Sequence, residues 1–187
     1  MRSPRQPLVW IISGPSGVGK GTVCAKLREL RPGIHIPVSL TTRQPRPGEI
    51  DGISYHFVPE YRFREMAASG QLLEHAVVHG RYSYGTPRKD VADAIAAGRD
   101  VLLEIDIQGA RQVKRNLPEA KLVFIAPPSW EELVKRLEGR GTEDASQVER
   151  RLTTARVELE AQEEADFVVV NDRIEDTAQA LIVLMGL

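Results

Sequence analysis

The sequence has very little cysteine and no long apolar segment. The single cysteine among the 187 residues, Cys24, cannot form a disulfide within the chain. No apolar run approaches the roughly 18 residues that a membrane-spanning helix needs. The apolar run that follows the basic start, residues 8–12, is shorter than the region of about 7 to 15 apolar residues in a secretory signal. The cytoplasm is therefore the expected compartment.

The chain also lacks an excess of charge of either sign. Lys and Arg number 25 and Asp and Glu number 26, which gives a formal net charge of -1. This balance provides no overall attraction to nucleic acid or to an anionic membrane, so neither is an expected partner. The hydrophobic fraction of 42% and the charged fraction of 27% are ordinary for a folded globular chain. Any site for an anion therefore has to be built locally.

Four short apolar segments alternate with helical patterns. The segments cover residues 8–12, 101–105, 122–125 and 167–170. Their β-branched and aromatic residues predict strands that are buried on both faces. The alternation predicts an α/β fold, with a P-loop parallel-sheet core and helices on both faces. Capping patterns predict helix starts at Thr86 (before Pro87), Ser129, Ser146 and Asp172, and the helix that follows Pro87 is expected to end near Gly98.

The length of 187 residues predicts a single domain. Two stretches interrupt the alternation and predict insertions into its core. Residues from about 34 to 86 contain clustered prolines and mixed polar segments, which predict a small inserted lobe. The sequence Gly139-Arg140-Gly141-Thr142 predicts a flexible joint and a lid over about 139–146. The core is then expected to comprise about 8–33, 87–138 and 147–187.

A glycine-rich loop follows the first expected strand and leads into a helical pattern. Its sequence is Gly14-Pro15-Ser16-Gly17-Val18-Gly19-Lys20-Gly21-Thr22. A strand, such a loop and a helix form a P-loop, whose backbone N–H groups and lysine bind nucleotide phosphates. The position after Lys20, where a Ser or Thr hydroxyl usually meets Mg²⁺, is Gly21. Mg²⁺ is then expected to be held mostly through water and phosphates, or Thr22 takes part of that role.

Two further segments carry residues suited to phosphate chemistry. The strand at 101–105 ends in carboxylates, including Asp106, which resembles the acidic element that helps to hold the water shell of the metal in P-loop enzymes. Arg43 and Arg46 lie in a proline-stiffened loop rich in hydroxyls. Arginine forks suit phosphate oxygens, so with Tyr55 and Tyr84 they favour a clamp for a monophosphate. Solvated surface arginines are the alternative interpretation.

Together, these segments resemble guanylate kinase. The matching blocks are GPSGVGKGT, SLTTRQPRPGEIDGISYHF, LLEHAVVHGRYSYGTP, LLEIDIQGA, KRLEGRGTE and VVVND, which follow the family's order from about residue 8 to the C-terminus. The resemblance implies a P-loop nucleoside monophosphate kinase that converts GMP and ATP to GDP and ADP with Mg²⁺, in purine nucleotide metabolism. It leaves open whether the enzyme is a monomer or a homodimer.

The resemblance also implies roles for individual residues. ATP is expected at the P-loop residues 14–22, with Asn171 and Asp172 against adenine. The GMP phosphate is expected at Arg43, Arg46, Tyr55 and Tyr84, and guanine at Ser39, Glu74, Thr86 and Asp106. One extra residue within 81–84 keeps Tyr82 open as the alternative to Tyr84. Catalysis is expected from Lys20, Arg43, Arg140 and Arg151, with Arg136 nearby.

Two other functions remain open at this point. Guanylate kinase-like domains of scaffolding proteins bind phosphopeptides without catalysis, but they typically have a degraded P-loop, whereas Lys20 and the loop glycines are present here. A kinase for another nucleoside monophosphate is the second alternative, because Gly21-Thr22 resembles the P-loops of adenylate kinases.

Of the remaining residues, Cys24 is expected to be packed in the core, and the acidic stretch 158–164 to form a solvated helix face.

Overall fold

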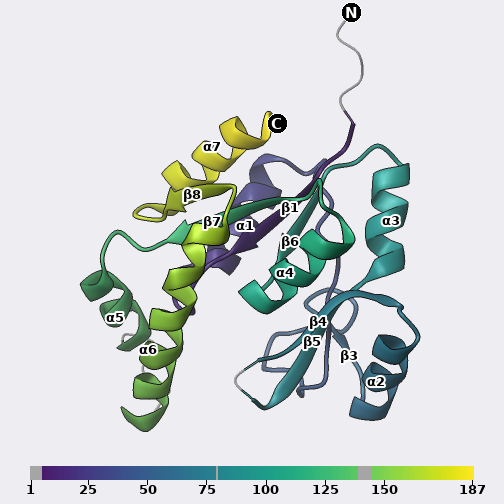
Figure 1. Ribbon diagram of the computed structural model, residues 1–187, viewed down its shortest axis with the longest axis horizontal. Coiled ribbons are helices and arrows are strands. Elements are labelled where there is room, and N and C mark those ends of the chain that lie inside the picture. The colour runs from purple at the N-terminus through teal and green to yellow at the C-terminus, as the bar shows by residue number, and fades with distance from the viewer. Residues whose placement is uncertain (1–5, 79, 139–144) are drawn as a thin grey trace, which may run out of the picture. The chain divides into compact units, whose positions relative to one another are not determined.

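The computed structural model describes residues 6–78, 80–138 and 145–187, with only the backbone described for 145–150. The chain folds into two compact units (Figure 1). The first unit contains the chain up to Val9, Ile34–Leu103 and Gln108–Ala120. The second contains Trp10–Gly33, Glu104–Ile107 and Lys121–Leu187. The predicted boundaries of core, lobe and lid stay predictions, and most of the predicted lid lies outside the described residues.

The second unit is built on parallel strands. Strand β1 (Val9–Ser13) pairs in parallel with β7 (Lys121–Ala126), which pairs in parallel with β8 (Phe167–Val170). These strands belong to a four-stranded sheet of the order β6-β1-β7-β8, in which β6 is Val101–Glu104 and only its last residue, Glu104, is part of the second unit. All four predicted strands are confirmed, and with them the α/β fold class and its parallel-sheet core.

The expectation that all four strands are buried is wrong for β8. Every residue of β1 is buried, whereas Phe167, Val168 and Val170 of β8 are 37% to 54% exposed. Strand β8 lies at the edge of its sheet. An apolar run predicts a strand but does not distinguish a central strand from an edge strand, and that difference explains the error.

Helices cover the strands of the second unit. Helix α1 packs against α7, and both bury leucines, Leu27 and Leu181. Helix α5 packs against α6. Cys24 of α1 is 3% exposed, which confirms that it is a core residue, and burial raises the pKa of its thiol. The helices are α1 (Lys20–Leu30), α5 (Trp130–Glu138), α6 (Ala145–Glu160), the short 3₁₀ helix η1 (Ala161–Glu164) and α7 (Ile174–Met185).

The first unit contains a second sheet, with the order β3-β2-β5-β4. The long strands β4 and β5 are antiparallel, and β2 pairs with β5 in antiparallel and with β3 in parallel orientation. Leu40, Phe63 and Leu72 form a buried apolar cluster in this unit. The elements are β2 (Leu40–Thr41), β3 (His56–Phe57), α2 (Glu60–Ala68), β4 (Leu72–Val78), β5 (Tyr82–Pro87) and α3 (Arg88–Ala96), and α4 (Ile107–Asn116) lies mostly in this unit.

The predicted helix starts agree only partly with the structure. The Glu132 N–H donates to Ser129 Oγ at 3.2 Å before α5, so the cap at Ser129 is confirmed. Helix α3 ends at Ala96, just before Gly98, as predicted. The cap at Thr86 is wrong, because this residue belongs to β5, and α7 is preceded by Arg173 rather than Asp172. The predicted cap at Ser146 lies outside the described side chains.

Among the described residues, no helix is both long enough and apolar enough to cross a bilayer.

The packing of α7 gives a test of the core. Leu181 is fully buried, so replacing it with alanine removes apolar contacts and leaves a cavity. We expect Leu181→Ala to lower the free energy of unfolding by about 2 to 5 kcal/mol in urea titrations. Val183 on the same helix is 72% exposed, and Val183→Ala should change the value by less than about 0.5 kcal/mol. Equal effects of the two substitutions would contradict the assigned packing.

Candidate functional site: two phosphate-binding elements

The glycine-rich loop connects β1 to α1 in the second unit, so the predicted succession of strand, loop and helix is confirmed. Gly14, Gly17 and Gly19 all have positive φ, at 147°, 85° and 97°. A Cβ on Gly14 would lie 2.3 Å from the carbonyl oxygen of Ile125, so no side chain fits there. The N-terminus of α1 at Lys20 has no acidic residue in its first turn, which leaves its partial positive charge available for an anion.

Lys20 lies against the backbone of its own loop. Its Nζ donates to the carbonyl oxygens of Gly14 at 2.6 Å and of Pro15 at 3.1 Å. Burial lowers the pKa of the Lys20 ammonium, and the negative charges of Glu158 and, more weakly, Glu104 oppose this effect. The loop therefore holds a cationic side chain among carboxylates of the same unit.

Asn171 supports the loop from the end of β8. It is 2% exposed, and its Nδ2 donates to the carbonyl oxygen of Val18 at 2.7 Å. The Thr177 hydroxyl donates to Asn171 Oδ1 at 2.9 Å, which fixes the orientation of the amide. Arg136 Nη1 donates to the Asn171 carbonyl oxygen at 3.0 Å, and Nη2 to that of Asp172 at 3.4 Å. The structure thus gives Asn171 a role in holding the loop, and contact of Asn171 and Asp172 with adenine stays a prediction.

Helix α6 contacts the loop at Ser16. Arg151 Nη2 donates to Ser16 Oγ at 2.9 Å, so the structure brings this predicted residue to the loop. The Ser16 N–H donates to Glu158 Oε2 at 2.9 Å. The expectation of a solvated acidic face is therefore wrong for Glu158. Its spacing from Arg151, seven residues or two helical turns, places both on one face and is a signal that sequence analysis missed. Arg140 lies outside the described residues.

Oxygen ligands suited to Mg²⁺ lie at the start of α1. A Cβ on Gly21 would be 3.3 Å from Glu104 Oε1, so the space beside the missing Ser or Thr side chain borders on a carboxylate. Burial raises the pKa of Glu104, and the charge of Lys20 opposes this rise. The negative charge of Asp106 also raises the pKa of Lys20, against the effect of burial. Because Mg²⁺ prefers oxygen ligands and retains water, the carboxylates and the Thr22 hydroxyl fit an ion held through its water shell.

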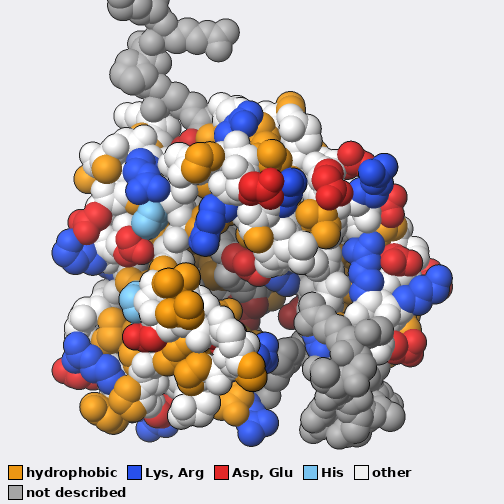
Figure 2. Space-filling view, turned by 180° about the vertical axis from the view of Figure 1, so that it is seen from behind, with side chains coloured by type: hydrophobic (Ala, Val, Ile, Leu, Met, Phe, Trp, Pro, Cys, Tyr) orange, Lys and Arg blue, Asp and Glu red, His pale blue; other side chains and the backbone are white. Residues whose placement is uncertain are grey.

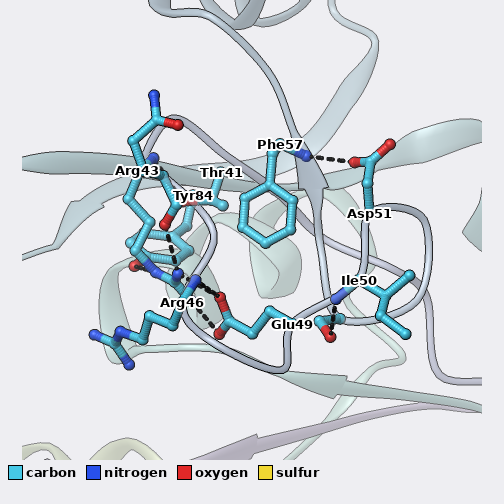
Figure 3. Close-up of polar contacts among 10 residues, drawn as sticks. Thr41, Arg43, Arg46, Glu49, Ile50, Asp51, Phe57 and Tyr84 are labelled. Atoms are coloured by element: carbon cyan, nitrogen blue, oxygen red, sulfur yellow. Dashed lines mark hydrogen bonds and ion pairs between the residues drawn. The ribbon is translucent and has the colours of Figure 1, made fainter.

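The second element, in the first unit, centres on Arg43, which is 7% exposed (Figure 3). Its Nη1 and Nη2 donate to the two carboxylate oxygens of Glu49, each at 2.6 Å, and its Nε donates to the Tyr84 hydroxyl at 3.2 Å. Its guanidinium also lies over the Tyr55 ring, 5.1 Å from the centroid. The structure therefore groups Arg43 with both predicted tyrosines, and Tyr84 rather than Tyr82 reaches it.

Glu49 is a residue of this element that sequence analysis missed. Besides Arg43, it binds the backbone N–H of Arg46, which donates to Glu49 Oε2 at 2.8 Å. The Arg46 side chain is exposed and points away from the carboxylate in Figure 3. These hydrogen bonds, foremost those from Arg43, lower the pKa of Glu49 from 4.5 to about 2. An anionic group thus already lies on the arginine fork that is predicted to bind phosphate.

A buried pair of polar side chains lies on the same sheet. Glu74 of β4 faces Thr86 of β5 in the register, and the Thr86 hydroxyl donates to Glu74 Oε1 at 2.6 Å. The two residues are 4% and 1% exposed. Ser39 directly precedes β2, whose first residue Leu40 pairs with Gly85. Two of the predicted guanine ligands, Glu74 and Thr86, therefore belong to this sheet and Ser39 is adjacent to it, whereas Asp106 belongs to the second unit.

A family model described as guanylate kinase matches residues 5–186. The chain belongs to the guanylate kinase family. This confirms the identification from the sequence blocks, and with it the class of enzyme, a P-loop nucleotide kinase.

Curated guanylate kinases resemble the chain over most of its length. One from Leifsonia xyli subsp. xyli is 57% identical over 175 residues, which cover 94% of this chain and 69% of that relative. One from Streptomyces kasugaensis is 54% identical over 180 residues, which cover 96% of this chain and 87% of that relative. The crystal structure of guanylate kinase from Anaplasma phagocytophilum is 35% identical in sequence and superimposes with a TM-score of 0.79. The matched region covers 96% of this chain and 85% of the chain in that crystal structure.

The Arg43–Glu49 pair gives a pH prediction. Because the pKa of Glu49 falls from 4.5 to about 2 on folding, its stabilisation is complete above pH 4.5 and is lost as the pH falls towards 2. We expect the difference in free energy of unfolding between wild type and Glu49→Gln to be constant above about pH 5 and to shrink below it. Urea titrations across this range measure it. Glu60→Gln, in an exposed pair with Arg64, should cost less than about 1 kcal/mol at any pH. A difference that does not depend on pH for Glu49→Gln would contradict the pairing.

Proposed function

We propose that this enzyme transfers the γ-phosphoryl group of ATP to GMP, giving GDP and ADP, as a cytoplasmic enzyme of purine nucleotide metabolism. The observation that carries the proposal is the buried Glu74–Thr86 pair on the sheet that also holds Arg43 and Tyr84. This sheet combines acceptors for a base with a cation for a phosphate. Membership of the guanylate kinase family supports the same reaction.

The base is proposed to be read by hydrogen bonding to Glu74, Thr86 and Ser39, with Asp106 as a further ligand. Guanine offers N1–H and N2–H₂ donors and the O6 acceptor on one edge. A carboxylate has about four acceptor positions, so Glu74 can accept from guanine as well as from Thr86. Adenine reverses the donor and acceptor on this edge and would leave buried groups unpaired, which disfavours AMP by orders of magnitude.

The GMP phosphate is proposed to bind at Arg43, Tyr55 and Tyr84, with the exposed Arg46 joining them. Arg43 is planar and already oriented by Glu49 and Tyr84, so little side-chain freedom is lost when it binds a phosphate. This division of the sheet, with a base reader and a phosphate clamp, supports residues of about 34–86 as the GMP-binding lobe.

The donor phosphates are proposed to bind at the P-loop, residues 14–22, with Lys20 leaving the Gly14 and Pro15 carbonyl oxygens to reach them. Bound Mg²⁺ supplies charge neutralisation on the β and γ phosphates. Thr22, Glu104 and Asp106 would hold its water shell. The lid, at about 139–146, and α6 would contribute Arg140 and Arg151.

The chemical step needs no protein nucleophile, because the GMP phosphate is already an anion. Its oxygen has to meet the γ phosphorus in line with the leaving oxygen of ADP, so catalysis consists of positioning and charge stabilisation. Lys20, Arg43, Arg140 and Arg151 are proposed to stabilise the charge of the transferring group. Closure of the lid over bound substrates would exclude water, which otherwise accepts the phosphoryl group.

A substrate panel tests the proposed base specificity. With ATP as donor, we expect kcat/KM for GMP to exceed that for AMP, CMP and UMP at least about a hundredfold in an assay of ADP release. Glu74→Gln places an amide among guanine donors and should raise the KM for GMP at least about tenfold, with the KM for ATP unchanged. Glu65→Gln, on the exposed face of α2, is the control. Equal use of several monophosphates would favour another kinase, and no turnover with any would favour a binding module.

The charge-stabilising roles are tested by truncation. We expect Lys20→Ala and Arg43→Ala each to lower kcat at least about a hundredfold, since each removes a charge from the transferring or the accepting phosphate. Circular dichroism should show an unchanged fold. Lys89→Ala, at a largely exposed side chain on α3, should keep wild-type rates. Near-native turnover of either variant at saturating substrate would overturn the assignment.

A further inference from the structure

The carboxylate of Glu158 lies at a place that a P-loop normally offers to phosphate. Its Oε2 accepts from the backbone N–H of Ser16 at 2.9 Å. Ser16 is the third residue of the loop that begins at Gly14, and the backbone N–H groups of such loops form the concave surface that binds nucleotide phosphates. A carboxylate resembles phosphate in its negative charge and its acceptor oxygens, so Glu158 satisfies a donor of the loop with an internal anion.

Helix α6 holds Ser16 at a second atom as well. Arg151, two turns before Glu158, donates from Nη2 to the Ser16 hydroxyl at 2.9 Å. Ser16 thus donates its N–H to an anion and accepts at its hydroxyl from a cation, both from the same helix. Between these two residues, Ala155 is fully buried, so this face of α6 is the packed face of the helix.

The charge of Glu158 also acts on Lys20. Burial lowers the pKa of the Lys20 ammonium, and nearby negative charges raise it. The charge of Glu158 raises this pKa more than those of Glu104 and Asp106 do. The same carboxylate therefore contacts a loop N–H and lies close enough to affect the loop lysine. Phosphates of a donor nucleotide would bind to the same cation and the same set of N–H groups, and their negative charge would repel the carboxylate.

We propose that Glu158 is a positioning residue that occupies the phosphate cradle of the nucleotide-free enzyme and is displaced from Ser16 by the phosphates of the donor. The inference rests on the proposed function only in that the loop binds the donor. Displacement breaks the hydrogen bond between the Ser16 N–H and Glu158 and leaves the hydrogen bond from Arg151 to the Ser16 hydroxyl. The arrival of the donor is thereby transmitted to the helix that carries Arg151.

The substitution Glu158→Gln tests the proposal, because an amide oxygen can still accept from the Ser16 N–H but carries no charge. We expect its Kd for ADP and for inorganic tripolyphosphate, measured by calorimetry without Mg²⁺, to fall about three- to tenfold, since a neutral acceptor is displaced more easily. Glu160→Gln removes the same charge from an exposed position of α6 and should leave both Kd values unchanged.

Kinetics separate this role from a merely structural one. We expect Glu158→Gln to lower the KM for ATP, to leave the KM for GMP unchanged and to keep the Tm of the free protein close to that of wild type. A Kd for ADP that is unchanged or raised relative to Glu160→Gln would overturn the inference and leave the proposed function intact. The calorimetric measurements contain no nucleoside monophosphate. If the enzyme phosphorylates a monophosphate other than GMP, only the proposed function is overturned. A wild-type enzyme that binds neither probe would overturn both.

Discussion

The path of the glycine-rich loop depends on one close approach, that of Gly14 to the backbone of β7. With the carbonyl oxygen of Ile125 2.3 Å from where a Cβ would be, only glycine lets the loop turn there. This turn sets where α1 begins and keeps Lys20 against the loop carbonyls. Asn171 then fixes the far side of the loop through Val18. The proposed phosphate cradle is thus formed by the backbone of the loop, which the side chains around it hold in place.

Both elements that are proposed to bind phosphate contain an internal carboxylate. Glu49 lies on the fork of Arg43, and Glu158 on a backbone N–H of the P-loop. A group that binds phosphate is costly to leave unpaired where water is excluded, and an acidic side chain satisfies it with the same kind of charge. Basic and acidic side chains are also mixed over the face seen in Figure 2. A net charge of -1 is therefore compatible with the proposed local anion sites.

Local patterns in the sequence predicted what local physics determines. The strands, the P-loop and the cap at Ser129 follow from the residues beside them, and the structure confirms them. Thr86 looked like a cap because of the proline after it, but it belongs to β5, where it pairs with Glu74 of β4. Glu158 and Ser16 are 142 residues apart. The spacing of Glu158 from Arg151 indicates a shared helix face, but it does not identify Ser16 as the residue that this face contacts. The exposed face of β8 likewise depends on which strands lie beside it.

The burial of Cys24 determines how the chain behaves towards oxidants and alkylating agents. Its thiol is packed in α1 and its pKa is raised, and the thiolate is the reactive form of cysteine. The only cysteine of the sequence is therefore protected from thiol-directed reagents while the protein is folded. A cysteine introduced on the surface, for example on α6, would be labelled selectively in an otherwise native background. Movements of that helix could then be followed with a single dye.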